Sequence, residues 1–467
     1  MKSQVLIIGG GISGLSTAWW LAQRGISVEI WESGSRPGGK IRSHSEAGYL
    51  TEDAAALLVN FRPQVDQMIS CLGLDEHRQQ RNEGLNRYIV HHDRLTPVPM
   101  LLPALLTSSL WSLPAKLRLM AEPFVPKGAH TGETVSEFIR RRLGQEVLDT
   151  AMDAFVSGTL ASDPDLAEAQ SVLPRLTTLE QRYGSLTMGM FINKVIKRRR
   201  ANNADTFSFD NGMEQLIQAL VQTPGIRLRT SAKALRIQQV KRGWRVQGKI
   251  GGLPADLQVP QLILSTPADI SSQLLEETDT TLSGLLADIE YAPVGVVHLG
   301  LNSNHIQHKL DGTGFLVAKH NSLPVNGNLW MSSLFPHRAP PGKTLLSSYI
   351  GGMRHPDQLQ QDDETLAGAV LDSLRPLMKI EGDADFISIR RHPRGLPLYH
   401  GQYRARLAQI ATCLQTLPCL QLNANYIGGV SVRERIYQGK CTAQAVTGNL
   451  KQSNSISHPQ QILTPSH

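Results

Sequence analysis

Three glycines, Gly9, Gly11 and Gly14, directly follow the apolar run Val5–Ile8. The run is typical of a buried parallel strand, and Ser16–Gln23 is predicted to be the helix that follows it. In such a unit the first glycine permits a tight turn, the second admits a diphosphate, and the third allows close helix–strand packing. The helix N-terminus then offers N–H donors and a positive dipole end to the phosphates. The motif predicts a Rossmann-type unit that binds a dinucleotide.

An acidic residue closes the second strand of this unit. Ser27–Trp31 is predicted to be that strand, and Glu32 follows it, placed to accept hydrogen bonds from an adenosine ribose. A carboxylate there would repel a 2′-phosphate, which argues against NADP. The segment Arg36–Arg42 (RPGGKIR) favours FAD over NAD, because its glycines can bring a second loop against the same diphosphate. Lys40 or Arg42 can add positive charge there; the alternative is a glycine turn with solvated basic side chains.

These motifs define a first set of predicted cofactor contacts. Its members are Gly9, Gly10, Gly11, Ile12, Ser13, Gly14, Glu32, Ser33, Gly39 and Lys40.

Size and composition indicate a folded protein of several domains. The 467 residues correspond to about three domain-sized pieces, and 41% hydrophobic with 19% charged residues fits a globular chain. The net charge of +7 favours an anionic partner, such as a carboxylate-bearing substrate or a membrane surface. Nucleic acid is not expected, because aromatic residues make up only 5% and no zinc-finger or RNP-like pattern occurs. No metal ligands are predicted, and 4 cysteines without a Cys-x-x-Cys pair favour a reducing, cytoplasmic location.

Residues 95–115 carry no charge and are long enough to span a bilayer, although their prolines oppose a spanning helix. One interpretation is a buried segment that lines a pocket. The other is peripheral contact with the inner face of the cell membrane, in which Leu110, Trp111 and Leu113 enter the lipid interface. The basic cluster Lys197–Arg200 is either a solvated loop or a second attraction to anionic lipid.

Helical segments precede a β-rich half of the chain. Glu133–Leu143 is predicted to be a helix capped by Thr131, and Leu166–Met190 is predicted to be largely helical. From Ile226 onward, runs of alternating and β-branched residues predict strands. The polar segment 448–467 has no periodicity and is expected to be a disordered tail.

Further motifs lie along almost the whole chain. They are Asn86–Val90 with Arg94–Pro99, Glu133–Val135, Arg141–Gly144, Phe155–Gly158, Leu179-Glu180, Tyr183–Leu186, Phe207–Phe209, Gly212-Met213, Leu334–Pro340, Tyr349–Gly352, Pro397–Tyr399 and Asn425–Val432. In order and spacing, from about Gln4 to Val446, this set resembles the protoporphyrinogen/coproporphyrinogen oxidase family. The Arg36–Arg42 segment resembles the second signature of the wider flavin amine oxidase superfamily.

The resemblance implies an α/β plus α+β fold. It would contain a discontinuous Rossmann-type FAD-binding domain, a mixed-sheet substrate domain, and a helical domain often associated with membrane. The implied segments are 1–60, 203–275 and 396–447 for the FAD-binding domain, 61–94 and 276–395 for the substrate domain, 95–202 for the helical domain, and 448–467 for the tail. It also implies noncovalent FAD and further cofactor contacts at Ala54, Ala55, Ala56, Leu57, Ala232, Val430, Ser431 and Val432.

The implied activity is the oxygen-dependent, six-electron oxidation of protoporphyrinogen IX to protoporphyrin IX in haem biosynthesis. The implied partners are the tetrapyrrole and dioxygen, and a homodimer and peripheral membrane contact are also considered. Arg87 matches an arginine that pairs with a substrate propionate, a task suited to a bidentate guanidinium; the alternative is a surface arginine. No catalytic residue is assigned.

Departures from the family pattern keep other functions open. Ala54-Ala55 stands where Gly-Pro is common, Ser162 replaces a glycine, and His392 replaces a frequent tryptophan. Thr313 and Ala318 also differ from the usual residues. The alternatives are a coproporphyrinogen III oxidase that forms coproporphyrin III, an FAD-dependent amine oxidase or desaturase acting on another metabolite, and a flavin-binding scaffold without activity.

Overall fold

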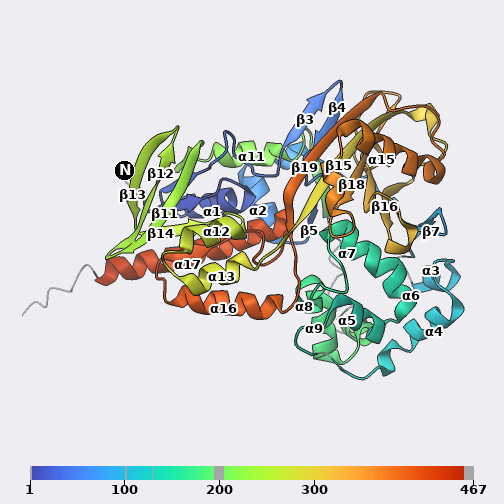
Figure 1. Cartoon of the computed structure of the whole chain (residues 1–467), viewed down its shortest axis with the longest axis horizontal. Coiled ribbons are helices and arrows are strands. Elements are labelled where there is room, and N and C mark those ends of the chain that lie inside the picture. Colours follow the sequence, from blue (N-terminus) through green and yellow to red (C-terminus); the bar gives the residue numbers. More distant parts are fainter. Residues whose placement is uncertain (1–2, 100–101, 129, 194–204, 457–467) are drawn as a thin grey trace, which may run out of the picture.

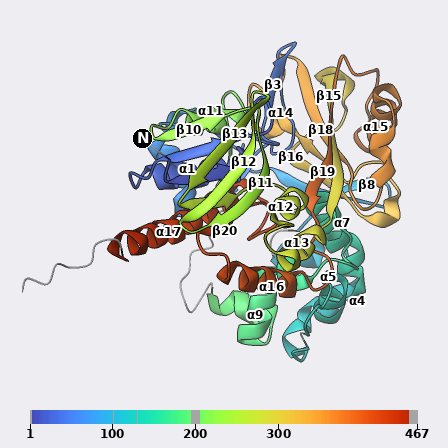
Figure 2. The ribbon, with the colours of Figure 1, turned by 60° about the vertical axis from the view of Figure 1, so that its left-hand side comes forward.

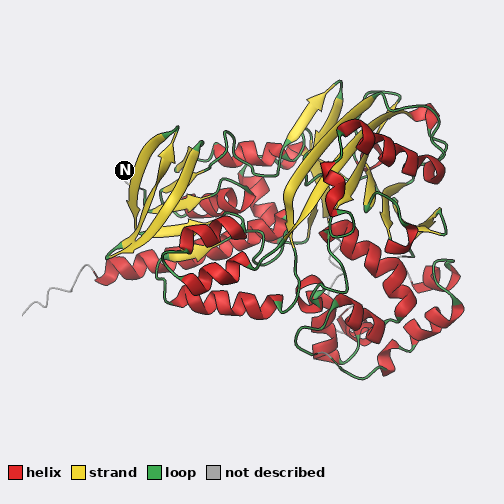
Figure 3. Cartoon of the chain, viewed as in Figure 1, coloured by secondary structure: helices red, strands yellow, loops and turns green. Residues whose placement is uncertain are grey.

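The structure is a computed structural model that describes residues 3–99, 102–128, 130–193 and 205–456. Two lobes are built around sheets, and a third lobe is helical (Figure 1). Figure 3 shows the separation by secondary structure, with the helical lobe below the larger sheet. The predicted class, α/β plus α+β with parallel and mixed sheets, is confirmed.

The first lobe contains a five-stranded, fully parallel sheet in the order β10-β2-β1-β14-β20. Its strands are β1 (Val5–Ile8), β2 (Val28–Trp31), β10 (Ile226–Arg229), β14 (Gln261–Leu264) and β20 (Leu420–Leu422). Three of these strands, β1, β2 and β14, are buried along their whole length, as expected for a parallel sheet covered on both faces. The N-terminal strand β1 lies at the centre, between β2 and β14, so segments far apart in the sequence complete one sheet.

Helices cover both faces of this sheet (Figure 2). One face packs against α1 (Ile12–Ala22), α2 (Pro63–Cys71), α11 (Glu214–Val221) and α17 (Val432–Ile456). The other packs against α12 (Ala268–Leu275), α13 (Thr280–Ala287), α16 (Tyr403–Gln415) and the three-stranded sheet of β11 (Ala232–Val240), β12 (Gly243–Ile250) and β13 (Leu253–Val259).

Two sequence-based boundaries in this lobe are wrong. Helix α1 begins at Ile12 rather than Ser16, because the chain enters the helix directly from Gly11 and Gly14 lies inside its first turns. The expected tail is ordered at its start, since α17 continues through Ile456 and its Val446 packs in the core against α1. The remainder of the tail lies outside the described residues.

The second lobe is a seven-stranded mixed sheet in the order β19-β15-β18-β17-β16-β7-β8. Its strands are β7 (Asn86–His91), β8 (Arg94–Pro97), β15 (Tyr291–Asn302), β16 (Gly312–Val317), β17 (Gly327–Trp330), β18 (Lys343–Gly351) and β19 (Phe386–Pro397). Helix α15 (Asp363–Met378) packs on one face through Leu366, Val370 and Leu374. The other face is turned toward the first lobe, as the contacts described below show.

Short strands lie between the two large sheets. They are the hairpin β3 (Ser43–Glu46) and β4 (Tyr49–Glu52), and the small sheet of β5 (Leu58–Asn60), β9 (Asp205–Phe209) and β6 (Arg78–Gln80). The short helix α14 (Met331–Leu334) comes later in the chain, directly after β17. Two segments pack differently from the expected partition. Helix α2 belongs to the core of the first lobe through Val65 and Met68, and α13 does so through Leu282 and Leu286, because their apolar faces meet the helices of that lobe. The domain boundaries otherwise remain predictions.

The third lobe consists of short helices. They are α3 (Leu102–Thr107), α4 (Leu113–Met120), the 3₁₀ turn η2 (Glu122–Phe124), α5 (Val135–Arg142), α6 (Gln145–Val147), the π-helical turn η3 (Leu148–Met152), α7 (Asp153–Leu160), α8 (Ala169–Val172), α9 (Pro174–Tyr183) and α10 (Leu186–Phe191). The cap of α5 is Thr134 rather than Thr131, because Thr134 and Glu137 form a reciprocal capping box. A buried ion pair between Arg142 and Glu122 joins α5 to η2.

The apolar segment 95–115 is not a continuous helix. Leu110 and Trp111 are buried at 0% and 8% exposure in the core of the helical lobe, so the expectation that they enter a lipid interface is wrong. Leu113 is 69% exposed, in line with that expectation. Among the described residues, none of the helices has the length and apolarity needed to cross a membrane. The basic cluster Lys197–Arg200 lies outside the described residues.

Candidate cofactor-binding site

The glycine loop after β1 has the geometry of a phosphate cradle. A Cβ on Gly14 would overlap the carbonyl oxygen of Gly9, and a Cβ on Gly9 would lie 2.7 Å from the carbonyl oxygen of Ser265. A Cβ on Gly11 would meet nothing within 4 Å. Two glycines are therefore required by the fold, whereas the third faces open space, as a loop that admits a diphosphate must. Ile12 and Ser13 begin α1 directly after this loop and bring its N-terminus to the same point.

Glu32 lies beside the loop at the carboxyl end of β2. Its carboxylate accepts the Gly10 N–H and the Gly34 N–H, each over 2.7 Å. Its carbonyl oxygen accepts the N–H of Ala232 over 2.8 Å. The structure thus brings together the acidic residue predicted to bind ribose, exposed Ser33 next to it, and Ala232, another predicted cofactor contact.

The second glycine loop contacts the first. The Gly38 N–H donates to the Gly10 carbonyl over 2.8 Å, and Gly11 and Gly38 form a parallel bridge. The Arg36 guanidinium orders this loop by donating to the carbonyls of Pro37, Gly39 and Ile41 over 2.9 to 3.2 Å. Sequence reasoning did not assign this role to Arg36, because a side chain that folds back on its own loop leaves no pattern.

Lys40 is the cation that this loop turns inward, whereas Arg42 is exposed. The Lys40 ammonium lies 5.9 Å from the centre of the Tyr291 ring. Burial, with a smaller contribution from the Arg394 charge, lowers the pKa of Lys40 to about 8. No carboxylate pairs with Lys40 in the described part of the chain. A cation held in this way is suited to an anionic ligand such as the diphosphate.

The other predicted contacts lie where the lobes meet. Ala54–Leu57 follows β4, and Val430–Val432 leads into α17. Arg433 Nη1 donates to the Val59 carbonyl over 2.9 Å, which ties the start of α17 to the chain just after Leu57. Arg435 was not predicted; it is 1% exposed and donates to the carbonyls of Ala424 and Ile427, which orders the loop before Val430.

Arg87 lies in β7, in the second lobe. It alternates with Tyr88, which packs in the core under α15, so Arg87 lies on the opposite face, turned toward the first lobe. The side chain is exposed, and partial desolvation together with the Arg81 charge lowers its pKa. No carboxylate pairs with Arg87 within the described residues, which leaves its guanidinium free for an anionic ligand. Its role in substrate binding remains a prediction.

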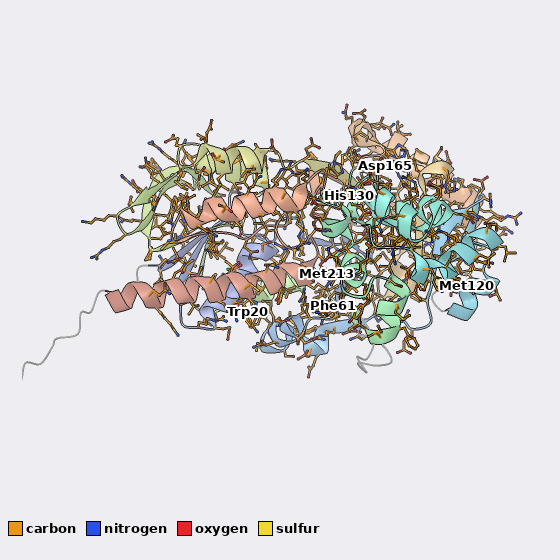
Figure 4. The ribbon with its side chains drawn as sticks, turned by 90° about the horizontal axis from the view of Figure 1, so that it is seen from below. Trp20, Phe61, Met120, His130, Asp165 and Met213 are labelled. Atoms are coloured by element: carbon orange, nitrogen blue, oxygen red, sulfur yellow. The ribbon has the colours of Figure 1, made fainter. Side chains whose placement is uncertain are left out.

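Two surface hollows adjoin the helical lobe, the second also lined by Lys319 and His320 just after β16, and none of the predicted cofactor contacts lines either. One, of about 450 Å³, includes Lys127 and His130, and the other, of about 390 Å³, includes Asp153 and Asp165. Figure 4 labels His130 and Asp165 on this lobe. Charged and polar side chains line both hollows, so neither offers the apolar walls expected for a flat tetrapyrrole.

A parallel sheet with this loop, acid and second glycine turn defines a Rossmann-type dinucleotide-binding protein. The family model for flavin-containing amine oxidoreductases matches residues 12–445. The chain therefore belongs to this family and is an FAD-dependent oxidoreductase, which confirms the predicted cofactor and superfamily.

Curated relatives match the chain over nearly its full length. It is 27% identical to protoporphyrinogen oxidase 2 of Arabidopsis thaliana, over 98% of this chain and 97% of the relative. It is 28% identical to coproporphyrinogen III oxidase of Staphylococcus aureus, over 96% of this chain and 100% of the relative. A crystal structure of an Exiguobacterium sp. 255-15 protein has the same fold, with a TM-score of 0.79, 22% identity, and coverage of 97% and 99%.

Proposed function

We propose that this enzyme oxidises a porphyrinogen to the corresponding porphyrin, with protoporphyrinogen IX as the principal substrate. The full-length similarity to protoporphyrinogen oxidases carries this proposal. The exposed Arg87 supports it, because an unpaired guanidinium on the face toward the cofactor site can bind a propionate. Six electrons leave the substrate, so three dioxygen molecules would each accept two and be released as hydrogen peroxide.

The chain's own residues have defined tasks in this proposal. Bound FAD supplies the hydride acceptor. The backbone around Gly11 and the Lys40 ammonium hold the diphosphate without a covalent link, and Glu32 holds the ribose. The ordered loop before Val430 and the segment Ala54–Leu57 position the reacting end of the cofactor. Arg87 orients the substrate through its propionate, which places a methylene bridge for oxidation.

Coproporphyrinogen III is the second candidate substrate. Two bacterial relatives of this activity match the chain at 26% and 28% identity. A second cation, Arg81, lies close enough to lower the pKa of Arg87, and two neighbouring guanidinium groups suit a substrate with more carboxylates.

An anaerobic stopped-flow experiment tests the proposal. The FAD-loaded protein is mixed separately with protoporphyrinogen IX, coproporphyrinogen III and putrescine. Fast bleaching of the flavin band by protoporphyrinogen, followed by porphyrin fluorescence in air, is the expected result. Faster bleaching by coproporphyrinogen would assign the second substrate, and bleaching by the amine alone would overturn both assignments. Arg87→Ala should raise KM for the porphyrinogen at least tenfold without loss of bound FAD, if one charged hydrogen-bonded pair of about 1.5–3 kcal/mol is removed.

We also infer that the enzyme contacts a membrane surface through an apolar face that shares only Leu113 with the one expected. The face consists of exposed side chains of α4, η2 and α10: Leu113, Leu117, Met120, Phe124, Met188, Met190 and Phe191. Helix α10 contacts η2, so these groups are neighbours, and Phe124 is 88% exposed. Figure 4 shows Met120 at the end of the molecule remote from Trp20 of the first lobe. A protein with such a face is suited to an interfacial contact.

Vesicle flotation tests this contact. The wild-type protein should float with vesicles that contain anionic lipid, and Phe124→Ser/Leu117→Ser should not. Equal flotation of both proteins would exclude this face. Size-exclusion chromatography of the same two proteins tests the expected homodimer, which stays a prediction.

A further inference from the structure

Three carbonyl groups in succession, those of Glu52, Asp53 and Ala54, accept side-chain hydrogen bonds from the seven-stranded sheet. His298 Nε2 lies 3.0 Å from the Glu52 carbonyl oxygen, and His392 Nε2 lies 2.8 Å from that of Asp53. The Tyr349 hydroxyl donates to the Ala54 carbonyl over a longer 3.4 Å. We call His298, His392 and Tyr349 the carbonyl anchor. They come from three adjacent strands, β15, β19 and β18.

The strand register explains why these side chains converge. Val294, Val296 and His298 are alternate residues of β15. His392 of β19 is paired with Val294, and Tyr349 of β18 is paired with Val296. Residues at this spacing point to one face of the sheet. The neighbouring Val297 and Leu299 point to the opposite face, where they pack in the core under α15. The whole anchor therefore faces the first lobe.

The Asp53 side chain is held from the same direction. Its carboxylate forms an ion pair with Arg390 Nε over 3.1 Å and a hydrogen bond with His44 Nε2 over 2.8 Å, and Arg36 Nη2 lies 3.9 Å away. Arg390 belongs to β19, and Arg36 is the residue that orders the second glycine loop. Asp53 thus connects the anchor to the loop that faces the cofactor diphosphate.

Local sequence gives the next residues little conformational restraint. Ala54 and Ala55 lack the fixed φ of a proline, and their side chains are too small to order the backbone. Hydrogen bonds to the carbonyls just before them supply that restraint from outside the segment. The side chains of His392 and Tyr349 are half-buried, and both are hydrogen-bonded to these carbonyl groups.

We propose that the carbonyl anchor positions the Ala54–Leu57 backbone against bound FAD, with His392 and Tyr349 as positioning residues. The proposal rests on the cofactor assignment of this segment in the proposed function. Neither residue touches the reacting atoms; each acts through a backbone carbonyl. His298 holds the start of the segment and, being fully buried with both ring nitrogens bonded, serves mainly stability.

Titration of apoprotein with FAD, followed by flavin fluorescence and the visible absorption spectrum, tests the anchor. Loss of one hydrogen bond should weaken FAD binding up to about tenfold. His392→Leu should show that loss and a shifted flavin spectrum, whereas His392→Gln, which keeps an N–H donor, should restore most of the affinity and the spectrum. Tyr349→Phe should weaken binding a few-fold.

Tyr88→Phe is the matched control. Tyr88 is a hydroxyl donor on the same sheet, but its partner is Asp311 and it faces α15. The Tyr88→Phe substitution should leave FAD affinity and the flavin spectrum unchanged. Affinities and spectra for Tyr349→Phe and His392→Leu that match this control would overturn the proposal. So would a His392→Gln variant as impaired as His392→Leu, because packing rather than hydrogen bonding would then explain the effect.

The outcome is separable from that of the proposed function. A protein that binds FAD with the expected ranking of variants but oxidises no porphyrinogen would defeat the proposed substrate and leave the anchor intact. Porphyrinogen oxidation without that ranking would defeat the anchor alone.

Discussion

Arg338 Nη1 donates a hydrogen bond to Glu52 Oε1 over 2.9 Å, and the two side chains are 0% and 2% exposed. Ser43 and the N–H of Met213 also donate to the Glu52 carboxylate. Figure 4 places Met213 near the middle of the molecule, where the lobes meet. Glu52 thus joins a hairpin, the first lobe and the second lobe at one buried point. Burial raises the pKa of Glu52, and the Arg338 charge opposes that rise.

Removing the cation alone should be costly. Arg338→Met leaves the Glu52 charge buried without its partner and should lower the free energy of unfolding by about 3–5 kcal/mol. The double variant Arg338→Met/Glu52→Gln should recover a large part of that loss, because no unpaired charge remains. Urea unfolding of the FAD-loaded proteins measures the free energy of unfolding of the single and the double variant. Equal destabilisation in the single and double variants would show that lost packing, not charge, is responsible.

A Gly→Ala substitution should have different effects at two positions of the glycine loop: loss of FAD binding at Gly11 and loss of folding at Gly14. Gly11→Ala should fold with a melting temperature close to that of wild-type apoprotein, since the new methyl meets nothing, yet it should lose FAD because the methyl occupies the diphosphate space. Gly14→Ala should unfold or misfold, because its methyl would overlap the Gly9 carbonyl. Calorimetry and flavin absorbance separate the outcomes. A yellow, fully loaded Gly11→Ala protein would contradict the phosphate-loop assignment.

FAD affinity should depend on pH through Lys40. In the apoprotein burial lowers the pKa of Lys40 to about 8, and a bound diphosphate would raise it again. Binding above pH 8 must then take up a proton, so affinity should fall as the pH rises past that value. Lys40→Arg should remove most of this dependence, because arginine stays charged. FAD titrations between pH 7 and 9.5 compare the wild type with Lys40→Arg. If the affinities of the two proteins change with pH in parallel, Lys40 is excluded from the phosphate site.

Acid should destabilise the protein through His298. Burial lowers the pKa of this histidine to about 4, while the unfolded value is near 6.5. The unfolded chain therefore binds the proton first, and stability falls as the pH drops from 6.5 to 4, by about 3 kcal/mol in all. His298→Gln should lack this part of the decline because the amide does not titrate. If the free energy of unfolding in urea changes equally with pH for the wild type and for His298→Gln, His298 is not the group responsible.

Much of the fold could be read from local sequence. Val5–Ile8 is a strand with the predicted bounds, since a short apolar run beside glycines has few other structures available. The position of Leu110 and Trp111 could not be read in this way. An uncharged stretch is compatible with a protein core and with lipid, and only the surrounding helices decide between them.

Glycine was predictable at Gly9 and Gly14, because few other residues fit a tight turn or a close packing contact. Glu32 was singled out by its place after the second strand, and its binding of the ribose stays a prediction. The roles of Arg36, Arg435 and the carbonyl anchor were not predicted, although His392 stood out as a departure from the family pattern, because these side chains act on backbone carbonyls. Any donor of suitable length can do so, and the partners lie up to hundreds of residues apart in the chain, as with His392 and Asp53.

The strand order of the first sheet also constrains how the chain can be made. Strands β1 and β2 leave the ribosome before β14, which lies on the other side of β1 and begins at Gln261, and before the edge strand β20, which begins at Leu420. Helix α17, which packs on α1, comes later still. The N-terminal strands must therefore wait, with apolar surface uncovered, while most of the protein is translated. We expect truncated nascent chains to be held by chaperones until α17 emerges, so that FAD is loaded only after α17 has been translated.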